Sequence, residues 1–148
     1  METEAMYALI TSYRDFYRVL RNLLRRYLET HNINAVDIWV LQNLVEHGHL
    51  NLRQVAELSG LTTGGCSEVI ERLTQRHYVR RERHPTNRRE IDCSITPEGY
   101  AVWQEAYGPT SSLYAYFNQS IDIAPEDIET VIRINRHLTE KLSAPPSG

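Results

Sequence analysis

The chain has 148 residues and a formal net charge of −3, and hydrophobic residues make up 41% of it. This length supports one sizeable core, and the composition is typical of a globular protein, not of a disordered or fibrous one. No apolar run approaches the roughly 20 residues of a membrane-spanning helix, and Met1–Glu4 lacks the basic and apolar regions of a signal peptide. We therefore expect a cytoplasmic protein that makes no membrane contact.

Residues 4 to 30 are predicted to form one long helix, because apolar side chains recur every three or four residues without an intervening Gly or Pro. Such a helix would be about 40 Å long and would carry a wide apolar stripe. That stripe must be buried, and a partner chain is the natural candidate to cover it. Asn34 and Asp37 then resemble a variant capping box that opens a second helix, ending near Glu46.

The central segment follows a helix-turn-helix pattern. A short helix over Leu52–Ser59 is followed by Gly60, which is suited to a tight turn. Thr62 is a good N-cap for a second helix that runs to about His77. The apolar residues of that second helix have core-facing spacing.

An arginine-rich hairpin is predicted next. Short apolar strands lie around Val79 and at Ile91–Ile95. Seven arginines and one acid, Glu82, occur between positions 72 and 89, which gives a local charge of 7 − 1 = +6. Arginine offers a planar fork that suits phosphates and guanine edges, and phosphate binding responds to the local field rather than to the net charge. This winged helix-turn-helix pattern makes double-stranded DNA the leading partner; the alternative is a solvated charged hairpin.

The remaining chain is helical in pattern. Thr96-Pro97-Glu98 is a strong helix start, and Gly108-Pro109 interrupts the helix that follows. A second segment covers about 110–119, and Pro125 opens the last helix. The tail, 143–148, is expected to be flexible.

These elements predict a mainly α-helical fold with a small β-wing, forming a single domain over 1–148. A winged helix-turn-helix module at 34–96 is flanked by terminal helices at 4–32 and 97–143, which we interpret as dimerisation helices. A symmetric homodimer of this kind places two modules to read half-sites roughly 34–36 Å apart.

Seven short motifs occur along nearly the whole chain: Val40–Leu44, Leu52–Glu57, Leu61–Gly65 (similar to "L-T-T-G-A"), Ile70–Leu73 ("V-D-R-L"), Pro85–Arg89 ("P-x-D-R-R"), Ile95–Gly99 ("L-T-P-E-G") and Tyr107–Pro109 ("Y-G-P"). In this order they resemble the MarR family of bacterial transcription regulators. Each motif is weak alone, and their shared order and spacing make the resemblance specific.

The resemblance implies a homodimeric repressor of near-palindromic promoter sites that is relieved by a small-molecule ligand. By position it assigns DNA contacts to the recognition helix and the wing: Thr62, Thr63, Gly64, Ser67, Glu68, Arg72, Arg88 and Arg89. Arg89 is the minor-groove candidate, and Arg72 braces the helix against the wing or touches phosphate. Asn87 is assigned to wing support.

Three positions depart from the family pattern. Asn87 stands where an Asp usually orients the wing arginine, so that brace loses charge assistance. Glu68 stands where an Arg is common; a carboxylate accepts from cytosine N4 but repels phosphate. His77 replaces a Gly and carries strain if its φ is positive.

The candidates for effector binding are aromatic. Family members often bind small aromatic or phenolic anions between the dimer helices and the DNA module, and Tyr13, Tyr17 and Trp39 are the candidate contacts here. Core and dimer packing is the alternative explanation for these rings.

Other chemistry has little support in the sequence. Cys66 and Cys93 match no disulfide framework, zinc ribbon or redox motif, and we interpret both as small buried hydrophobes rather than oxidant sensors. The six histidines form no convincing metal set, and no nucleotide-binding, HExxH or G-x-S-x-G motif occurs. We expect no cofactor, no metal and no enzymatic activity. The competing hypothesis is a MarR-like interaction protein that has lost specific DNA binding.

Overall fold

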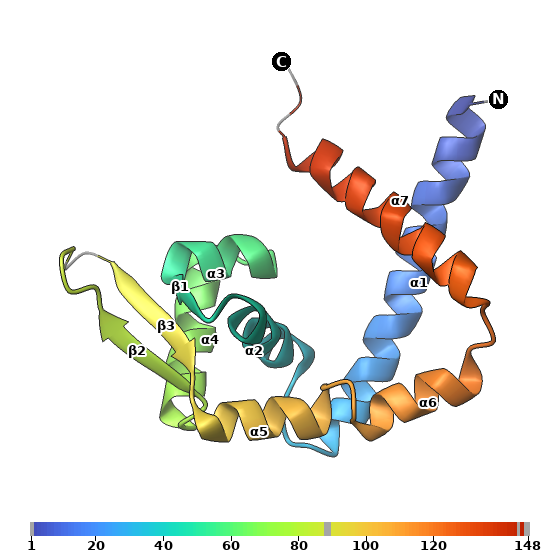
Figure 1. The fold of residues 1–148 in the computed structure, drawn as a ribbon. Helices are drawn as coiled ribbons and strands as arrows, with labels where there is room; N and C mark the ends of the chain where they lie inside the picture. Colours follow the sequence, from blue (N-terminus) through green and yellow to red (C-terminus); the bar gives the residue numbers. More distant parts are fainter. Residues whose placement is uncertain (1, 88–89, 145, 147–148) are drawn as a thin grey trace. The chain divides into compact units, whose positions relative to one another are not determined.

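The computed structural model describes residues 2–87, 90–144 and 146 of the chain. They fall into two compact units, one ending at Tyr114 and the other beginning at Ala115. The elements, in chain order, are α1 (Glu2–Glu29), α2 (Ala35–His47), β1 (His49–Asn51), α3 (Leu52–Ser59), α4 (Thr63–Gln75), β2 (Val79–Arg83), β3 (Ile91–Ile95), α5 (Pro97–Ala106), α6 (Ser112–Ser120) and α7 (Pro125–Ser143), as Figure 1 shows. The mainly helical fold with a small sheet confirms the predicted fold class.

Three helices begin at the caps that the sequence predicted. The Asn34 Oδ1 atom accepts from the Asp37 amide at 2.8 Å, and the hydroxyls of Thr62 and Thr96 accept from the amides of Gly65 and Gly99 at 3.0 Å each. Each cap satisfies one of the free N–H groups of a first turn. These local bonds therefore fix where α2, α4 and α5 start.

The reciprocal half of the capping box predicted at Asn34 and Asp37 is wrong. The Asp37 carboxylate is buried and bonds to Arg72 on α4 instead of turning back to its own helix start. A complete capping box occurs at the next helix, between Asn51 and Gln54 at the start of α3, with bonds of 2.9 and 2.8 Å. The sequence analysis missed it.

The sheet has three antiparallel strands in the order β1-β3-β2, with Leu50 opposite Cys93 and Val79 opposite Ile95. Both wing strands were predicted, whereas β1 was not. The strand β1 has three residues, of which only Leu50 is buried. Three residues are too few to show an alternating pattern in the sequence.

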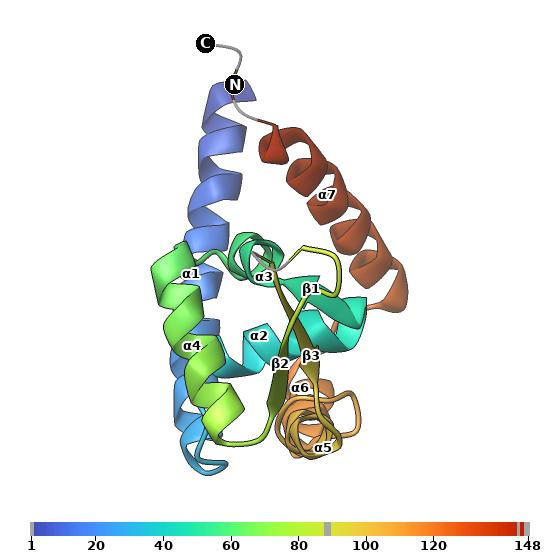
Figure 2. The same cartoon turned by 90° about the vertical axis from the view of Figure 1, so that its left-hand side faces the viewer.

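The core of the first unit lies where α2, α3, α4 and the sheet meet. Each of these elements contributes fully buried apolar side chains, among them Ile38, Leu41, Val55, Ile70, Leu73 and Val79. The helix α4 packs against both α3 and β2, and Figure 2 shows α4 in the same view as the hairpin. The helix α4 buries one side in this core, and its opposite side is exposed to solvent.

The turn that leads from α4 into the wing is tightly built. The helix ends at Gln75, two residues earlier than predicted, and His77 follows with a φ of 64°, which meets the condition under which strain is expected there. The Thr96 hydroxyl donates to the His77 carbonyl at 2.6 Å. A Cβ on Gly99 would lie 2.1 Å from the Tyr78 carbonyl oxygen, so only glycine fits at this contact.

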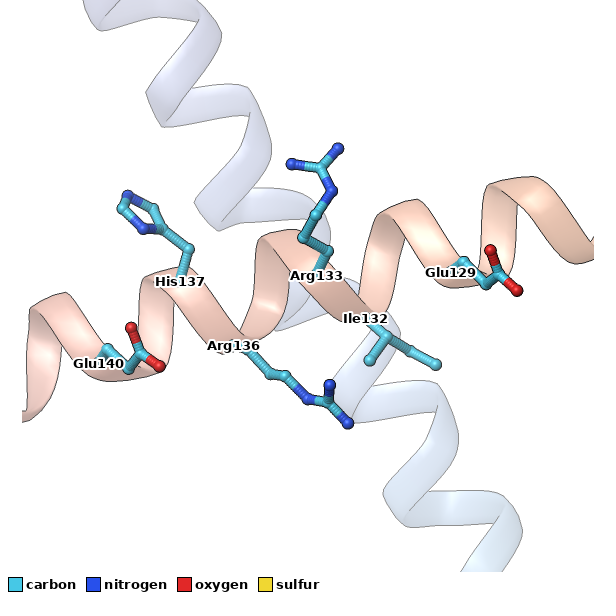
Figure 3. A pocket seen from close by; sticks show the side chains of 6 residues that line it. All are labelled: Glu129, Ile132, Arg133, Arg136, His137 and Glu140. Carbon is cyan, nitrogen blue, oxygen red and sulfur yellow. The ribbon is translucent and has the colours of Figure 1, made fainter.

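The second unit contains the end of α6 and all of α7. No residue of α7 is buried, and its apolar side chains Ile128, Val131 and Ile132 are 44–51% exposed. Figure 3 shows six side chains that line a shallow hollow on α7: Glu129, Ile132, Arg133, Arg136, His137 and Glu140. All six come from one helix, and five of them are charged or titratable.

Candidate DNA interface

One line of residues occupies the centre of the exposed side of α4. Cys66, Val69, Ile70 and Leu73 form the buried side of this helix. Opposite them, at spacings of four, three and four residues, lie Gly64, Glu68, Glu71 and Gln75, and all four are exposed. We call these four residues the outer stripe of α4. The periodicity of an α-helix makes them a continuous row along the surface.

The outer stripe includes part of the predicted DNA-contact set. Gly64 and Glu68 are in it, while Thr63 is exposed and Ser67 half-exposed at its edges. Thr62 is exposed as well, but its hydroxyl already caps the helix. Glu71 and Gln75 were missed by the sequence analysis, although their spacing of seven and eleven residues from Gly64 would have identified them.

Arg72 connects α4 to α2. Its Nε atom donates to Asp37 Oδ2 at 3.2 Å, and its Nη2 atom donates to Asp37 Oδ1. The Arg72 side chain is 44% exposed, whereas that of Asp37 is 2% exposed. The hydrogen bond to Asp37 raises the pKa of the Arg72 guanidinium, which is therefore charged at every working pH. In the described chain Arg72 bonds Asp37 on α2 and not the wing, in place of the predicted brace, and its alternative contact with phosphate stays a prediction.

The two faces of the wing carry different charge. Residues opposite one another in an antiparallel pair point to the same face. Val79, Arg81 and Arg83 pair with Ile95, Cys93 and Ile91, so both of these arginines share the face of the buried residues that pack toward α4. We call this the inner face of the wing.

The other face is acidic on balance. It carries Arg80 opposite Ser94 and Glu82 opposite Asp92. The Arg80 Nε atom lies 3.8 Å from Glu82 Oε1, which offsets the charge of that arginine. Exposed positive charge in the two wing strands is therefore concentrated on the inner face, the face toward α4.

His84 organises the described part of the wing turn. Its Nδ1 atom accepts from the backbone amides of Thr86 at 3.3 Å and Asn87 at 3.2 Å. The His84 amide donates to the Glu90 carbonyl at 2.9 Å, and the Glu90 amide donates to the Asn87 carbonyl at 3.0 Å. Arg88 and Arg89 lie outside the described residues, so their assigned contacts and the support from Asn87 stay predictions.

Both cysteines lie beneath this surface. Cys66 and Cys93 are fully buried, and neither forms a disulfide. Burial raises the pKa of the Cys66 thiol and raises that of Cys93 to about 11, with a smaller contribution to Cys93 from Cys66. The thiolate is the reactive form, so these environments disfavour thiol reactivity. This agrees with the interpretation of both residues as small buried hydrophobes.

Two of the three effector candidates lie together. The rings of Tyr17 on α1 and Trp39 on α2 stack with centroids 6.4 Å apart. Tyr13 lies one helical turn before Tyr17 and is half-exposed. The Trp39 side chain is also half-exposed, so this pair has an accessible surface.

Two searches over residues 2–87, 90–144 and 146 bear on other kinds of site. Within that set, three or more His, Cys, Asp or Glu side chains do not gather into a group that could hold a metal ion. The helices in the same part of the chain also fall short of the combined length and apolar character that crossing a bilayer requires.

Sequence comparisons place the central module in a known group. A profile described as "MarR family" matches residues 31–90, which span α2, β1, α3, α4 and β2 and end before β3. The uncharacterized HTH-type transcriptional regulator YwaE of Bacillus subtilis is 30% identical over 107 residues, covering 72% of this chain and 63% of YwaE. The present chain therefore spans less than two thirds of that relative's length.

Solved structures extend the similarity over almost the whole chain. The MarR family regulator Sco3205 of Streptomyces coelicolor, solved in complex with DNA, is 25% identical with a TM-score of 0.77, over 96% of this chain and 90% of its own. The transcriptional regulator BldR of Sulfolobus solfataricus shares the fold at 20% identity and a TM-score of 0.77, covering 93% of this chain and 99% of its own.

Proposed function

The chain belongs to the MarR family of transcriptional regulators, and from that premise we propose that it binds double-stranded promoter DNA as a homodimer and acts as a repressor. In this proposal α4 enters the major groove and the wing follows the neighbouring backbone and minor groove. A small aromatic or phenolic effector relieves repression.

One observation carries the proposal: the helix α4, with its exposed outer stripe, packs against β2, a wing strand whose exposed Arg81 and Arg83 share the inner face. A duplex seated there places base edges against the N-terminal half of α4 and phosphates against Arg81 and Arg83. The face of the wing opposite the inner face carries Glu82 and Asp92, whose carboxylates repel phosphate, so this face is expected to remain in solvent.

The homodimer rests on uncovered apolar surface in each unit. On α1, Met6 and Ile10 lie one helical turn apart and are 51% and 48% exposed, and Phe16 is 61% exposed. On α7 the apolar residues Val131 and Leu142 are 51% and 73% exposed. Isolated apolar residues on a surface are ordinary, but repeated stripes of this kind indicate a protein–protein contact. A two-fold axis through such a contact matches a near-palindromic operator.

Effector relief rests on the Tyr17–Trp39 pair, because these rings join the long helix α1 to the DNA-binding module. A ligand that stacks there shifts DNA affinity only if it binds one dimer geometry more tightly than the other. Because Trp103 also emits, quenching of the tryptophan fluorescence by phenolic acids is compared among wild type, Tyr17→Ala and Trp39→Phe to test this part of the proposal.

The primary experiment measures binding of the purified protein to a fragment from upstream of its own gene and to a scrambled duplex, over a salt series. Tight, selective binding with a steep salt dependence is expected. Equal weak binding to both duplexes would place the operator elsewhere and requires selection from random sequences. Absence of binding to either duplex at low salt contradicts the proposal.

The second candidate function is an interaction protein that retains the scaffold without specific DNA binding. Two carboxylates in the outer stripe, Glu68 and Glu71, favour it, because both repel phosphate. The inner-face arginines argue against it. Sedimentation of a stable dimer with no affinity for duplex DNA would make this candidate the better account.

A further inference from the structure

The position of Glu68 points to a particular kind of base reading. We propose that Glu68 is the specificity-determining residue of α4 and that it selects a cytosine, and thus a C·G pair, in each half-site. The inference rests on the proposed DNA-binding function and adds the base class that the recognition helix reads.

Glu68 is placed where base contacts are expected. It occupies the outer stripe of α4 one turn after Gly64, in the half of the helix nearer its start. In helix-turn-helix proteins the N-terminal residues of the recognition helix contact base edges. Glu71 and Gln75 are one and two turns further along, where the helix leaves the groove.

The Glu68 carboxylate is available to an external donor. Its side chain makes no hydrogen bond or ion pair with another residue of the described chain. The charge of Glu68 contributes to the raised pKa of the nearby Arg72, but the guanidinium of Arg72 is hydrogen-bonded to the buried Asp37. Both oxygens of Glu68 therefore keep their acceptor capacity in the free protein.

Chemistry then selects among the four bases. An ionised carboxylate accepts hydrogen bonds and donates none. In the major groove cytosine presents an N4 amino donor, guanine presents the acceptors N7 and O6, and thymine presents the acceptor O4. Adenine presents its N6 donor beside the N7 acceptor, which repels a carboxylate. Cytosine is thus the base whose edge best matches Glu68.

Gly64 supplies an independent indication that another molecule approaches this stripe closely. Glycine is unfavourable within a helix relative to alanine, and here its backbone does not adopt a positive φ. A Cβ at Gly64 would meet nothing within 4 Å, so no packing in the described chain requires its absence. This contrasts with Gly99, where a Cβ would collide with backbone. A bare helix surface at Gly64 lets a duplex approach near enough for Glu68 to reach base edges.

The same carboxylate weakens sequence-independent binding, because it lies near the phosphates that flank the groove. Arg81 and Arg83 on the inner face of the wing provide the compensating attraction. Affinity and specificity therefore reside in different elements, and removing the Glu68 charge affects them in opposite directions.

The test is selection of preferred duplexes from a random pool by full-length wild-type protein, Glu68→Gln and Glu71→Gln. The two variants remove the same charge from the same exposed stripe, so Glu71→Gln is the matched control. Circular dichroism verifies that all three proteins fold. Affinities for the selected duplex and for a scrambled one are then measured by fluorescence anisotropy.

We expect the wild-type consensus to hold a C·G pair at one position of each half-site, with about 5- to 100-fold weaker binding when that pair is replaced. Glu68→Gln should move the preference at this position toward A·T, since glutamine bonds adenine N6 and N7. Both variants should bind scrambled DNA more tightly than wild type, and Glu71→Gln should keep the wild-type consensus.

An unchanged consensus in Glu68→Gln overturns the inference while leaving DNA binding itself intact. A wild-type consensus without a C·G pair that depends on residue 68 overturns it equally. Absence of any DNA binding by the wild type refutes the proposed function first and the inference with it.

Gly64→Ala provides a second readout. Because its Cβ has free space in the protein, this substitution should raise the midpoint of thermal unfolding. It should also weaken binding to the selected duplex. A variant that is more stable and binds equally well would contradict the proposed close approach of the duplex at Gly64.

Discussion

The recognition helix and the wing are held in place by different means. The helix α4 is fixed from below by buried apolar side chains and by the Arg72–Asp37 pair, and its outer stripe carries two acids and no base. The wing strands carry exposed arginines, and the described part of the wing turn is organised by backbone bonds around His84. Under the proposed function, this difference assigns sequence reading to α4 and attraction for the DNA backbone to the wing.

The largest effect is expected from breaking the link between α4 and α2. Arg72→Ala leaves the buried Asp37 carboxylate without its partner and should destabilise the protein by about 3–5 kcal/mol. Asp37→Ala leaves a half-exposed guanidinium that water can solvate, so its cost should be smaller, about 1–3 kcal/mol. Urea unfolding of both variants measures the difference, and equal costs would contradict the asymmetry.

A wing substitution should affect binding rather than folding. Arg89→Ala is expected to weaken binding to the preferred duplex by about 1–3 kcal/mol, because a minor-groove arginine combines a phosphate attraction with a base contact. Arg80→Ala is the matched control, since Arg80 lies beside Glu82 on the face of the wing opposite the inner face. Fluorescence anisotropy gives both affinities, and unchanged binding by Arg89→Ala refutes the role assigned to Arg89.

Alkaline pH should lower the free energy of unfolding through Cys93, which is buried beneath α4 and the wing. Its pKa is raised by burial from 9.0 to about 11, so the folded state holds the thiol proton more tightly than the unfolded state does. The contribution is complete below about pH 9 and is lost as the pH rises through 11, for a total of about 2–3 kcal/mol. The difference between the unfolding free energies at pH 8 and pH 11 should be smaller in Cys93→Ala than in wild type. An identical pH dependence in the two proteins would argue against this cause.

The smallest effect is expected at the joint between α4 and the wing. His77 has a φ of 64°, a conformation that costs an L-residue about 1 kcal/mol and glycine almost nothing. His77→Gly should therefore stabilise the protein by somewhat less than that amount, because glycine also gains entropy in the unfolded state. A lower melting temperature for His77→Gly would show that the His77 side chain contributes more than its backbone strain costs.

Local signals in the sequence were sufficient for much of the fold. The caps at Asn34, Thr62 and Thr96 depend on neighbours within three residues, and the structure confirms each of them. The strand β1 was missed because its formation depends on pairing with β3, more than forty residues away, rather than on its own pattern.

The site was less predictable for the same reason. Asp37 has the sequence context of a capping residue, and only the packing of α2 against α4 brings its carboxylate to Arg72. The charge difference between the two wing faces likewise depends on the register of β2 with β3, which the hairpin sequence alone does not fix. Glu71 and Gln75 were available from helical spacing and were overlooked, because the positions considered were those carried over from the family.

The most direct test compares the salt dependence of DNA binding for wild type, the double variant Arg81→Ala/Arg83→Ala and Arg80→Ala, each on a preferred and a scrambled duplex. If the inner face of the wing contacts phosphates, the double variant should lower the slope of log affinity against log salt by about 2 on both duplexes. Arg80→Ala should leave that slope unchanged, and the ratio between the two duplexes should persist in every protein because α4 sets it. Equal slopes for wild type and the double variant would contradict the division between a wing that attracts DNA and a helix that reads it.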